Sequence, residues 1–108
     1  MAEYINNVPG MAPPIGYSFA VKKIGRPVFL AGQVALDGEG RIVGEGDAAA
    51  QVEQVFENLR RVLAACGGTL RDVVKINVYV TDPSHRPAIA EARLRHFAPG
   101  EFPASTYV

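Results

Sequence analysis

The chain has 108 residues and a mass of 11.6 kDa, which suits a single domain. Hydrophobic residues make up 48% of it, enough to form a core, and eleven basic residues balance eleven acidic ones. A formal net charge of zero argues against nucleic-acid binding, which usually needs a basic patch. Cys66 is the one cysteine, so no internal disulfide can form; this fits a reducing compartment, and we expect a cytoplasmic protein.

Residues 1–16 contain three prolines, two glycines and two asparagines, which predict an irregular arm. This stretch has neither the basic start nor the apolar centre of a signal peptide. No segment approaches the roughly 20 apolar residues that a membrane span needs. We therefore expect no membrane association.

Aromatic and β-branched residues predict strands over residues 17–24 and 28–34, joined as a hairpin by the breaker Gly25-Arg26-Pro27. Gly32, inside the second strand, indicates either a bulge or a point where a ligand approaches the backbone. Residues 41–43 are a candidate for a short third strand.

Apolar residues between Val52 and Cys66 recur at helical spacing and predict an amphipathic helix. Asp47 is a suitable N-cap for it, and the Gly67-Gly68 pair is typical of a helix end. Cys66 closes the apolar stripe and is expected to pack as a small hydrophobic residue. The two histidines are too few for a metal site without other ligands, so no metal is expected.

Residues 73–80 predict a strand with one apolar face and one half-polar face. A second helix is expected over residues 88–97, with Pro87 near its start, and a last strand begins at Ser105. The order of elements predicts an α+β protein with a mixed β-sheet and two helices packed on one face. A helix that joins two strands in this way usually makes a parallel crossover.

Several stretches carry a resemblance to a known family: GYS over residues 16–18, VFLAGQVALD over 28–37, QVFENLRRVLAACGGTLRDVVKINVYVTD over 54–82 and FPAST over 102–106. From about residue 14 onward, the chain resembles the Rid/YjgF (reactive intermediate deaminase, endoribonuclease L-PSP-like) family. The resemblance implies a chorismate-mutase-like, YjgF-like fold, one domain over residues 1–108, and a homotrimer with ligand clefts between subunits. Family members continue through one more strand, which carries a glutamate that positions water; that strand is not present in this sequence.

Deaminases of that family hydrolyse enamines and imines, and an arginine in a Pro-Ala-Arg-Ser/Thr motif holds the substrate carboxylate. Here the motif reads Pro103-Ala104-Ser105-Thr106, so Ser105 stands where the arginine is expected. A neutral hydroxyl supplies neither the fork geometry nor the charge of a guanidinium. Ala90 also differs from the asparagine that deaminases often have. The resemblance thus predicts a member without the catalytic arginine.

Four residues are implied as ligand-binding: Tyr17, Gly32, Ser105 and Tyr107, the last where many members have cysteine. Each of the first three has a plain alternative: an edge or interface aromatic for Tyr17, a simple bulge for Gly32, and strand packing for Ser105. The catalytic residues remain open. Candidates for a substitute cation are Lys22, Lys23, Arg26 and Arg71.

Two function classes follow. One is a deaminase- or hydrolase-like enzyme that acts on an imine or enamine without the arginine-dependent 2-imino acid reaction. The other is a non-catalytic small-ligand-binding or regulatory trimer. An endoribonuclease is less favoured because no basic patch gathers in the sequence. In either class we expect a small-molecule partner and no cofactor.

Overall fold

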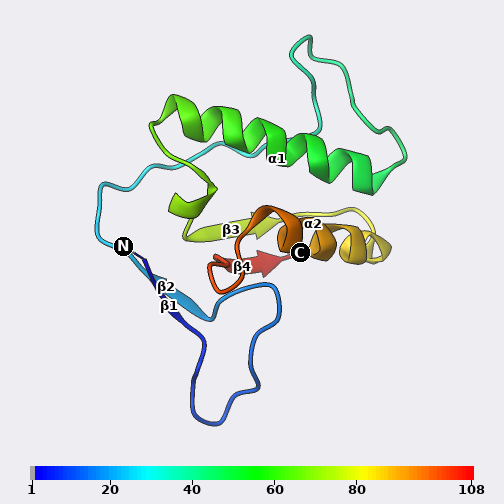
Figure 1. The fold of residues 1–108 in the computed structure, drawn as a ribbon. Helices are drawn as coiled ribbons and strands as arrows, with labels where there is room; N and C mark the ends of the chain where they lie inside the picture. The colour runs from blue at the N-terminus through cyan, green and yellow to red at the C-terminus, as the bar shows by residue number, and fades with distance from the viewer. Residues whose placement is uncertain (1) are drawn as a thin grey trace.

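The computed structural model describes residues 2–108 (Figure 1). Its elements are β1 (Glu3–Ile5), β2 (Ala20–Lys22), α1 (Ala48–Ala65), η1 (Leu70–Asp72), β3 (Lys75–Val78), η2 (Pro83–His85), α2 (Arg86–His96) and β4 (Ala104–Tyr107). None of the helices in residues 2–108 has the length and apolar character needed to cross a membrane. The arrangement confirms the predicted α+β class.

Helix α1 confirms the amphipathic helix predicted from the sequence. It begins after Asp47, whose carboxylate accepts a hydrogen bond from the Ala50 amide at 3.1 Å. It ends at Cys66, and Gly67 then takes a positive φ of 81°, which favours glycine. The expected packing of Cys66 is wrong: its side chain is exposed because the residue caps the helix beyond the buried stripe.

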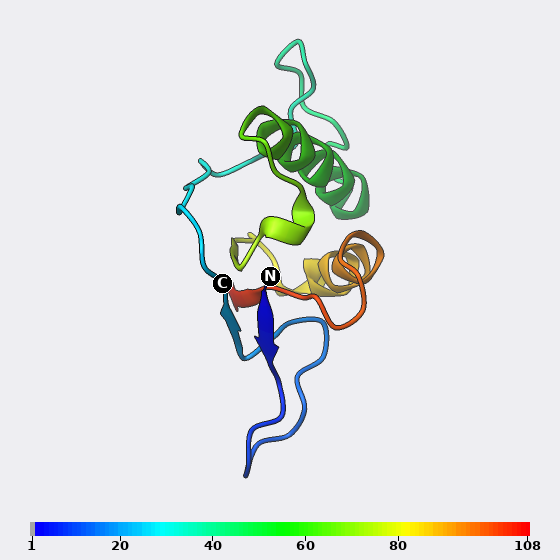
Figure 2. The ribbon, with the colours of Figure 1, turned by 60° about the vertical axis from the view of Figure 1, so that its left-hand side comes forward.

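The core joins both helices. Its buried members are Phe56, Leu63, Leu70, Ala92 and Phe97, and partly buried Leu30, Val52, Leu59, Val73 and Phe102 pack against them. From α1 the core receives residues 52, 56, 59 and 63, an apolar seam with steps of four, three and four residues. Turning the molecule shows α1 lying over α2, with β4 beside α2 and the β1–β2 pair below (Figure 2).

Strands β3 and β4 form a parallel pair with α2 as the crossover between them, as the sequence predicts. In this register Ile76 pairs with Ser105 and Val78 pairs with Tyr107. These four side chains share the face of the pair that α2 covers, because α2 residues contact both Ser105 and Tyr107. The opposite face is exposed and carries Lys75, Asn77 and Thr106.

The predicted hairpin between residues 17–24 and 28–34 is wrong. Strand β2 pairs instead with β1, in antiparallel register with Tyr4 opposite Val21, inside the arm expected to be irregular. Residues 28–34 have no strand partner within the described chain, and Phe29 is 92% exposed. An extended segment without a ladder neighbour is not a strand, and this one runs as a loop between β2 and α1 (Figure 1).

The candidate strand over residues 41–43 is reduced to a single antiparallel bridge between Leu36 and Ile42. The described strands therefore form two separate two-stranded sheets, one antiparallel and one parallel, in place of one continuous mixed sheet. Helix α2 begins at Arg86, with Pro87 in its first turn, where the missing amide donor is harmless.

Candidate functional site

Strand β4 presents two of the predicted ligand-binding residues to α2. Ser105 and Tyr107 lie two positions apart and therefore point to the same face of the strand. Thr106, between them, points to the other face, where its hydroxyl accepts a hydrogen bond from Lys75 Nζ at 2.6 Å. The structure thus brings Ser105 and Tyr107 together on the helix-covered side.

Arg93 of α2 meets Ser105 there. Its Nη1 donates to the Ser105 hydroxyl oxygen at 3.0 Å, and the arginine residue is only 7% exposed. Its Nε is buried and has no partner in the described chain. Burial lowers the pKa of the Arg93 guanidinium, and the positive charge of Arg86 lowers it further, while Tyr107 acts in the opposite direction.

Tyr107 is held by a second arginine. The Arg86 guanidinium carbon lies 5.0 Å from the centroid of the Tyr107 ring, within the range of a cation–π contact. The Tyr107 hydroxyl is buried and has no hydrogen-bond partner among residues 2–108. A buried hydroxyl normally finds a partner, so this group has an unused donor.

The segment with Tyr17 lies beside the start of β4. The amide of Ser18 donates to the Pro103 carbonyl at 3.1 Å, and both of these residues are buried. The Asn6 side chain fastens the same segment by accepting from the Phe19 amide at 3.1 Å. Tyr17 itself is 36% exposed and meets Phe19 edge to face, with ring centroids 6.0 Å apart.

Gly32 lies apart from Tyr17, Ser105 and Tyr107. It lies in the loop of residues 28–34, is exposed, and is not among the glycines with positive φ. A Cβ added at Gly32 would meet no atom within 4 Å, so nothing in residues 2–108 requires a glycine there. Neither a bulge in a strand nor a close backbone approach is formed within this chain.

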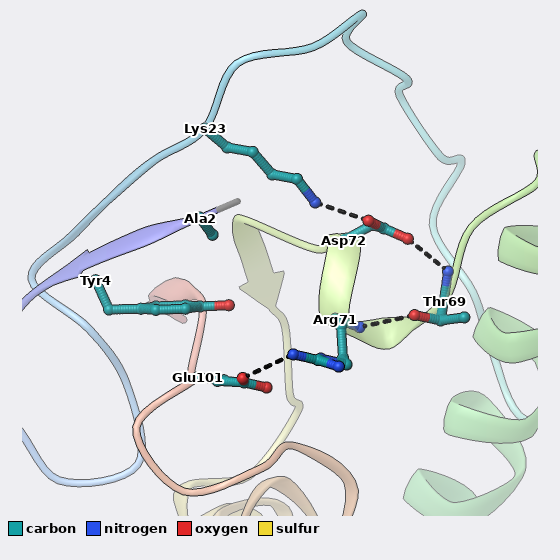
Figure 3. A pocket seen from close by; sticks show the side chains of 7 residues that line it. All are labelled: Ala2, Tyr4, Lys23, Thr69, Arg71, Asp72 and Glu101. Carbon is teal, nitrogen blue, oxygen red and sulfur yellow. Dashed lines mark hydrogen bonds and ion pairs between the residues drawn. The ribbon is translucent and has the colours of Figure 1, made fainter.

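Two of the four predicted substitute cations, Lys23 and Arg71, line a hollow of about 290 Å³ between the β1–β2 pair and η1 (Figure 3). There Lys23 pairs with Asp72 at 2.7 Å, and Arg71 pairs with Glu101 at 3.2 Å. The pKa of the Asp72 carboxyl is lowered, mainly by the hydrogen bond from Lys23 and to a smaller extent by the hydrogen bond from the Thr69 amide. Both cations of this hollow are thus already paired with acids.

The two remaining candidates are surface groups. Lys22 approaches Glu3 at 4.0 Å, and both side chains are well exposed. Arg26 is exposed in the loop that follows β2. None of the four predicted cations contacts Ser105 or Tyr107 in the described chain. Arg93 and Arg86 are not among the residues predicted from the sequence, although Arg93 follows the buried Ile89 by one helical turn and therefore lies on the same helix face.

His96 is the last residue of α2, and its side chain is largely covered. Its ring stacks on Phe56, with centroids 4.3 Å apart and an interplanar angle of 18°. Its Nε2 lies 2.7 Å from Glu53, which also accepts a hydrogen bond from Arg95. That bond from Arg95 is the main reason for the lowered pKa of Glu53, and His96 adds to it. This network joins α1 to α2, and no group of three or more potential metal ligands occurs in residues 2–108.

Residues 9–108 match the family described as Endoribonuclease L-PSP. The chain is 34% identical to the 3-aminoacrylate deaminase RutC of Acinetobacter baylyi over 95 residues, covering 88% of this chain and 75% of the relative. It is also 34% identical to a 2-iminobutanoate/2-iminopropanoate deaminase of Dermatophagoides farinae over 100 residues, covering 91% and 77% of the two chains. A RutC family protein of Pyrococcus abyssi is 43% identical over 70 residues, 64% of this chain and 54% of that protein. The chain thus spans just over half the length of the Pyrococcus protein.

Among solved structures, the Rid family protein YyfB of Yersinia pestis superposes with a TM-score of 0.88 at 35% identity. The superposition covers 98% of this chain and 83% of the YyfB chain. This agreement confirms the YjgF-like fold implied by the sequence resemblance. The chain belongs to the Endoribonuclease L-PSP, or Rid/YjgF, family.

Proposed function

We propose that this protein is a Rid-family homotrimer that acts on a small metabolite at clefts between subunits. Its reaction is deaminase- or hydrolase-like: water adds to the C=N bond of an imine, or of the imine tautomer of an enamine, and ammonia leaves. Two relatives named as deaminases, one for 3-aminoacrylate and one for 2-iminobutanoate/2-iminopropanoate, support this class of chemistry. The protein does not use the arginine-dependent 2-imino acid reaction.

The observation that carries this proposal is Ser105. In Pro103-Ala104-Ser105-Thr106 it stands where the resemblance places the carboxylate-binding arginine of the deaminases. Its hydroxyl lies on the helix-covered face of β4 and is already engaged by Arg93. Loss of one partner from a desolvated charge pair costs about 2–5 kcal/mol, or roughly thirty- to several-thousand-fold in affinity. A 2-imino acid would therefore be held far more weakly at this position of β4.

Four residues are proposed to touch the ligand: Tyr17, the backbone of Gly32, Ser105 and Tyr107. The placement of Ser105 and Tyr107 on one face of β4 supports their part in a common site. The hydrogen bond from Ser18 to Pro103 supports a place for Tyr17 near the same strand. Because Gly32 lies in an exposed loop, its role depends on a cleft completed by a neighbouring subunit.

The trimer is supported by surface that the single chain leaves uncovered. Its accessible surface is 7490 Å², whereas a folded monomer of 11.6 kDa is expected to expose about 5,800 Å². Large apolar side chains contribute to this excess, with Ile24 at 98%, Phe29 at 92% and Tyr79 at 76% exposure. Association of three copies through the exposed face of β3–β4 would cover part of this surface.

A second candidate is a non-catalytic ligand-binding or regulatory trimer on the same scaffold. It is favoured by the absence, within residues 2–108, of a carboxylate or imidazole hydrogen-bonded to Ser105, Tyr107 or Arg93. General acid–base catalysis needs such a group within hydrogen-bond reach of the reacting proton. The two candidates share the site and differ in whether water is activated there.

The test couples an imine-generating dehydratase to a pyruvate readout. We compare the parent protein, Ser105→Arg, and an arginine-bearing relative with the uncatalysed hydrolysis of 2-iminopropanoate. We expect the parent to match the uncatalysed rate and Ser105→Arg to recover part of the relative's rate. Recovery is partial because Ala90 and Tyr107 also reshape the pocket, and binding alone does not align water for attack.

Ser105→Gln serves as the matched control, since it adds side-chain length without charge and should stay at the parent's rate. A parent as fast as the relative would refute the argument from Ser105. If Ser105→Arg also fails to accelerate hydrolysis, the missing charge is not the main reason for the parent's inactivity. That result would favour the non-catalytic binding candidate. A thermal-shift screen of the parent against a metabolite library then identifies ligands, because binding to the native state raises stability.

A further inference from the structure

Arg93 is an unusual residue for this core. Among the buried residues of the described chain it is the one that carries a charge, and no carboxylate in residues 2–108 forms an ion pair with it. A buried charge is normally paired with an opposite charge, since burial strips away the water that would stabilise it. The Ser105 hydroxyl accepts one hydrogen bond but leaves the positive charge uncompensated.

The charged groups nearest to Arg93 deepen this imbalance. Arg86, about two turns earlier on the same helix, brings a second guanidinium to the site and contacts the ring of Tyr107. The acids of the neighbouring helix surface are engaged elsewhere: Glu91 and Glu53 both pair with Arg95. Asp82 caps η2 by accepting from the Ser84 amide. The site formed by Arg86, Arg93, Ser105 and Tyr107 therefore has a net positive charge.

The hydrogen-bonding groups of this site are all able to donate. Because the Ser105 oxygen accepts from Arg93, the proton of the same hydroxyl remains available to a ligand. The buried Tyr107 hydroxyl and the buried Nε of Arg93 have no partner among residues 2–108. Two cations and a set of free donors are the surroundings that an oxyanion requires.

We propose that Arg93, assisted by Arg86, binds the oxyanion end of this protein's ligand, so that the anion-binding guanidinium enters from α2 and not from β4. The ligand is a small metabolite with a carboxylate or phosphate group, bound by Arg93 and by the hydroxyls of Ser105 and Tyr107. This inference rests on the proposed function, which places the ligand at Ser105 and Tyr107. Because the cation enters from a different element, the reacting end of the ligand is held in a different orientation from that in an arginine-bearing deaminase.

The experiment measures equilibrium binding of defined anions to the full chain at constant ionic strength. Acetate and pyruvate probe carboxylates, inorganic phosphate and methyl phosphate probe phosphates, and sodium chloride at equal ionic strength is the baseline. The ¹⁵N–¹H resonance of the Arg93 Nε is followed by NMR during each titration. We expect a saturable shift of that resonance with one of the two anion classes, and the class that responds identifies the ligand chemistry. No saturable shift with any of the four anions up to tens of millimolar would overturn the proposal.

Variants supply a second measurement. Arg93→Met removes the charge at nearly the same volume, and we expect it to weaken anion binding at least about thirty-fold. Because it also removes an unpaired buried charge, we expect its melting temperature without ligand to equal or exceed that of the parent. Arg93→Lys keeps the charge but loses the fork geometry and should bind with intermediate affinity.

The matched control is Arg95→Met, two residues further along α2, which breaks the pairs with Glu53 and Glu91 but leaves the site intact. It should lower the melting temperature and keep the anion affinity of the parent. Equal anion affinity in Arg93→Met and the parent would refute the inference. This result is independent of the deaminase assay, because the anion can bind at Arg93 whether or not an imine is hydrolysed. Hydrolysis of an imine without anion binding at Arg93 would overturn the inference and leave the proposed function standing.

Discussion

The prediction that tests the core most directly is Phe56→Ala. Phe56 is 5% exposed, stacks on His96 and meets Phe97 edge to face at 5.7 Å. Truncating a buried phenylalanine to alanine costs about 3–5 kcal/mol, because its burial is lost and a cavity remains. The total stability of a domain of this kind is about 5–15 kcal/mol, so this one substitution removes at least about a fifth of it.

Urea unfolding followed by far-UV circular dichroism measures this loss, since the chain has no tryptophan to report by fluorescence. Protein concentration is held constant, because the stability of an oligomer depends on it. Leu94→Ala is the matched control: Leu94 is 56% exposed on α2, so its truncation should change the free energy of unfolding by less than about 0.5 kcal/mol. A loss below about 1 kcal/mol for Phe56→Ala would show that Phe56 is not central to the core.

Three further predictions follow from the structure. Leu59→Asp places a charge against the core cluster and should prevent folding. Val55→Asp should lower the melting temperature less, because Val55 is half-buried and lies outside that cluster. Melting curves of both variants test the two expectations. Acid should weaken the contact between α1 and α2, because the pKa of Glu53 is lowered in the folded state. The stability that ionised Glu53 contributes is therefore fully present above its ordinary pKa of 4.5 and is lost as pH falls through the lowered pKa of the folded state. Melting temperatures between pH 7 and 3 should therefore fall less steeply for Glu53→Gln than for the parent, and parallel slopes would contradict this. Sedimentation should give a trimer, and a monomer at micromolar concentration would overturn that prediction.

The segments that could be predicted from sequence are those whose burial pattern is local. Helix α1 repeats its apolar residues at a fixed spacing and has both a capping aspartate and a terminating glycine, so its limits follow from the chain itself. Strand β3 alternates in burial between Lys75 and Val78, which is the period of a strand with one covered face. In both cases the evidence lies within a few consecutive residues.

Residues 28–34 were mispredicted because strand formation depends on a partner as well as on composition. Val28, Phe29 and Val34 have strong β preference, yet all three are exposed in the single chain. The β1 strand was missed for the opposite reason: prolines and asparagines surround Glu3–Ile5, but the Asn6 side chain and the β2 strand give it a partner. No local pattern distinguishes these two segments.

The candidate site departs from sequence expectation at the point where burial and polarity disagree. On α2 the hydrophobic Leu94 is 56% exposed, while its neighbour Arg93 is 7% exposed, the reverse of what a stable core favours. Ile89 and Ala92 are also buried, so the helical period places position 93 on the inward face. A prediction that assigns every arginine to the surface therefore does not find Arg93. Residues that are unfavourable for stability at their position occur most often at functional sites. If position 93 served packing alone, methionine would fill it without an unpaired charge, and the arginine would have no physical reason to lie beside Ser105 and the unused Tyr107 hydroxyl.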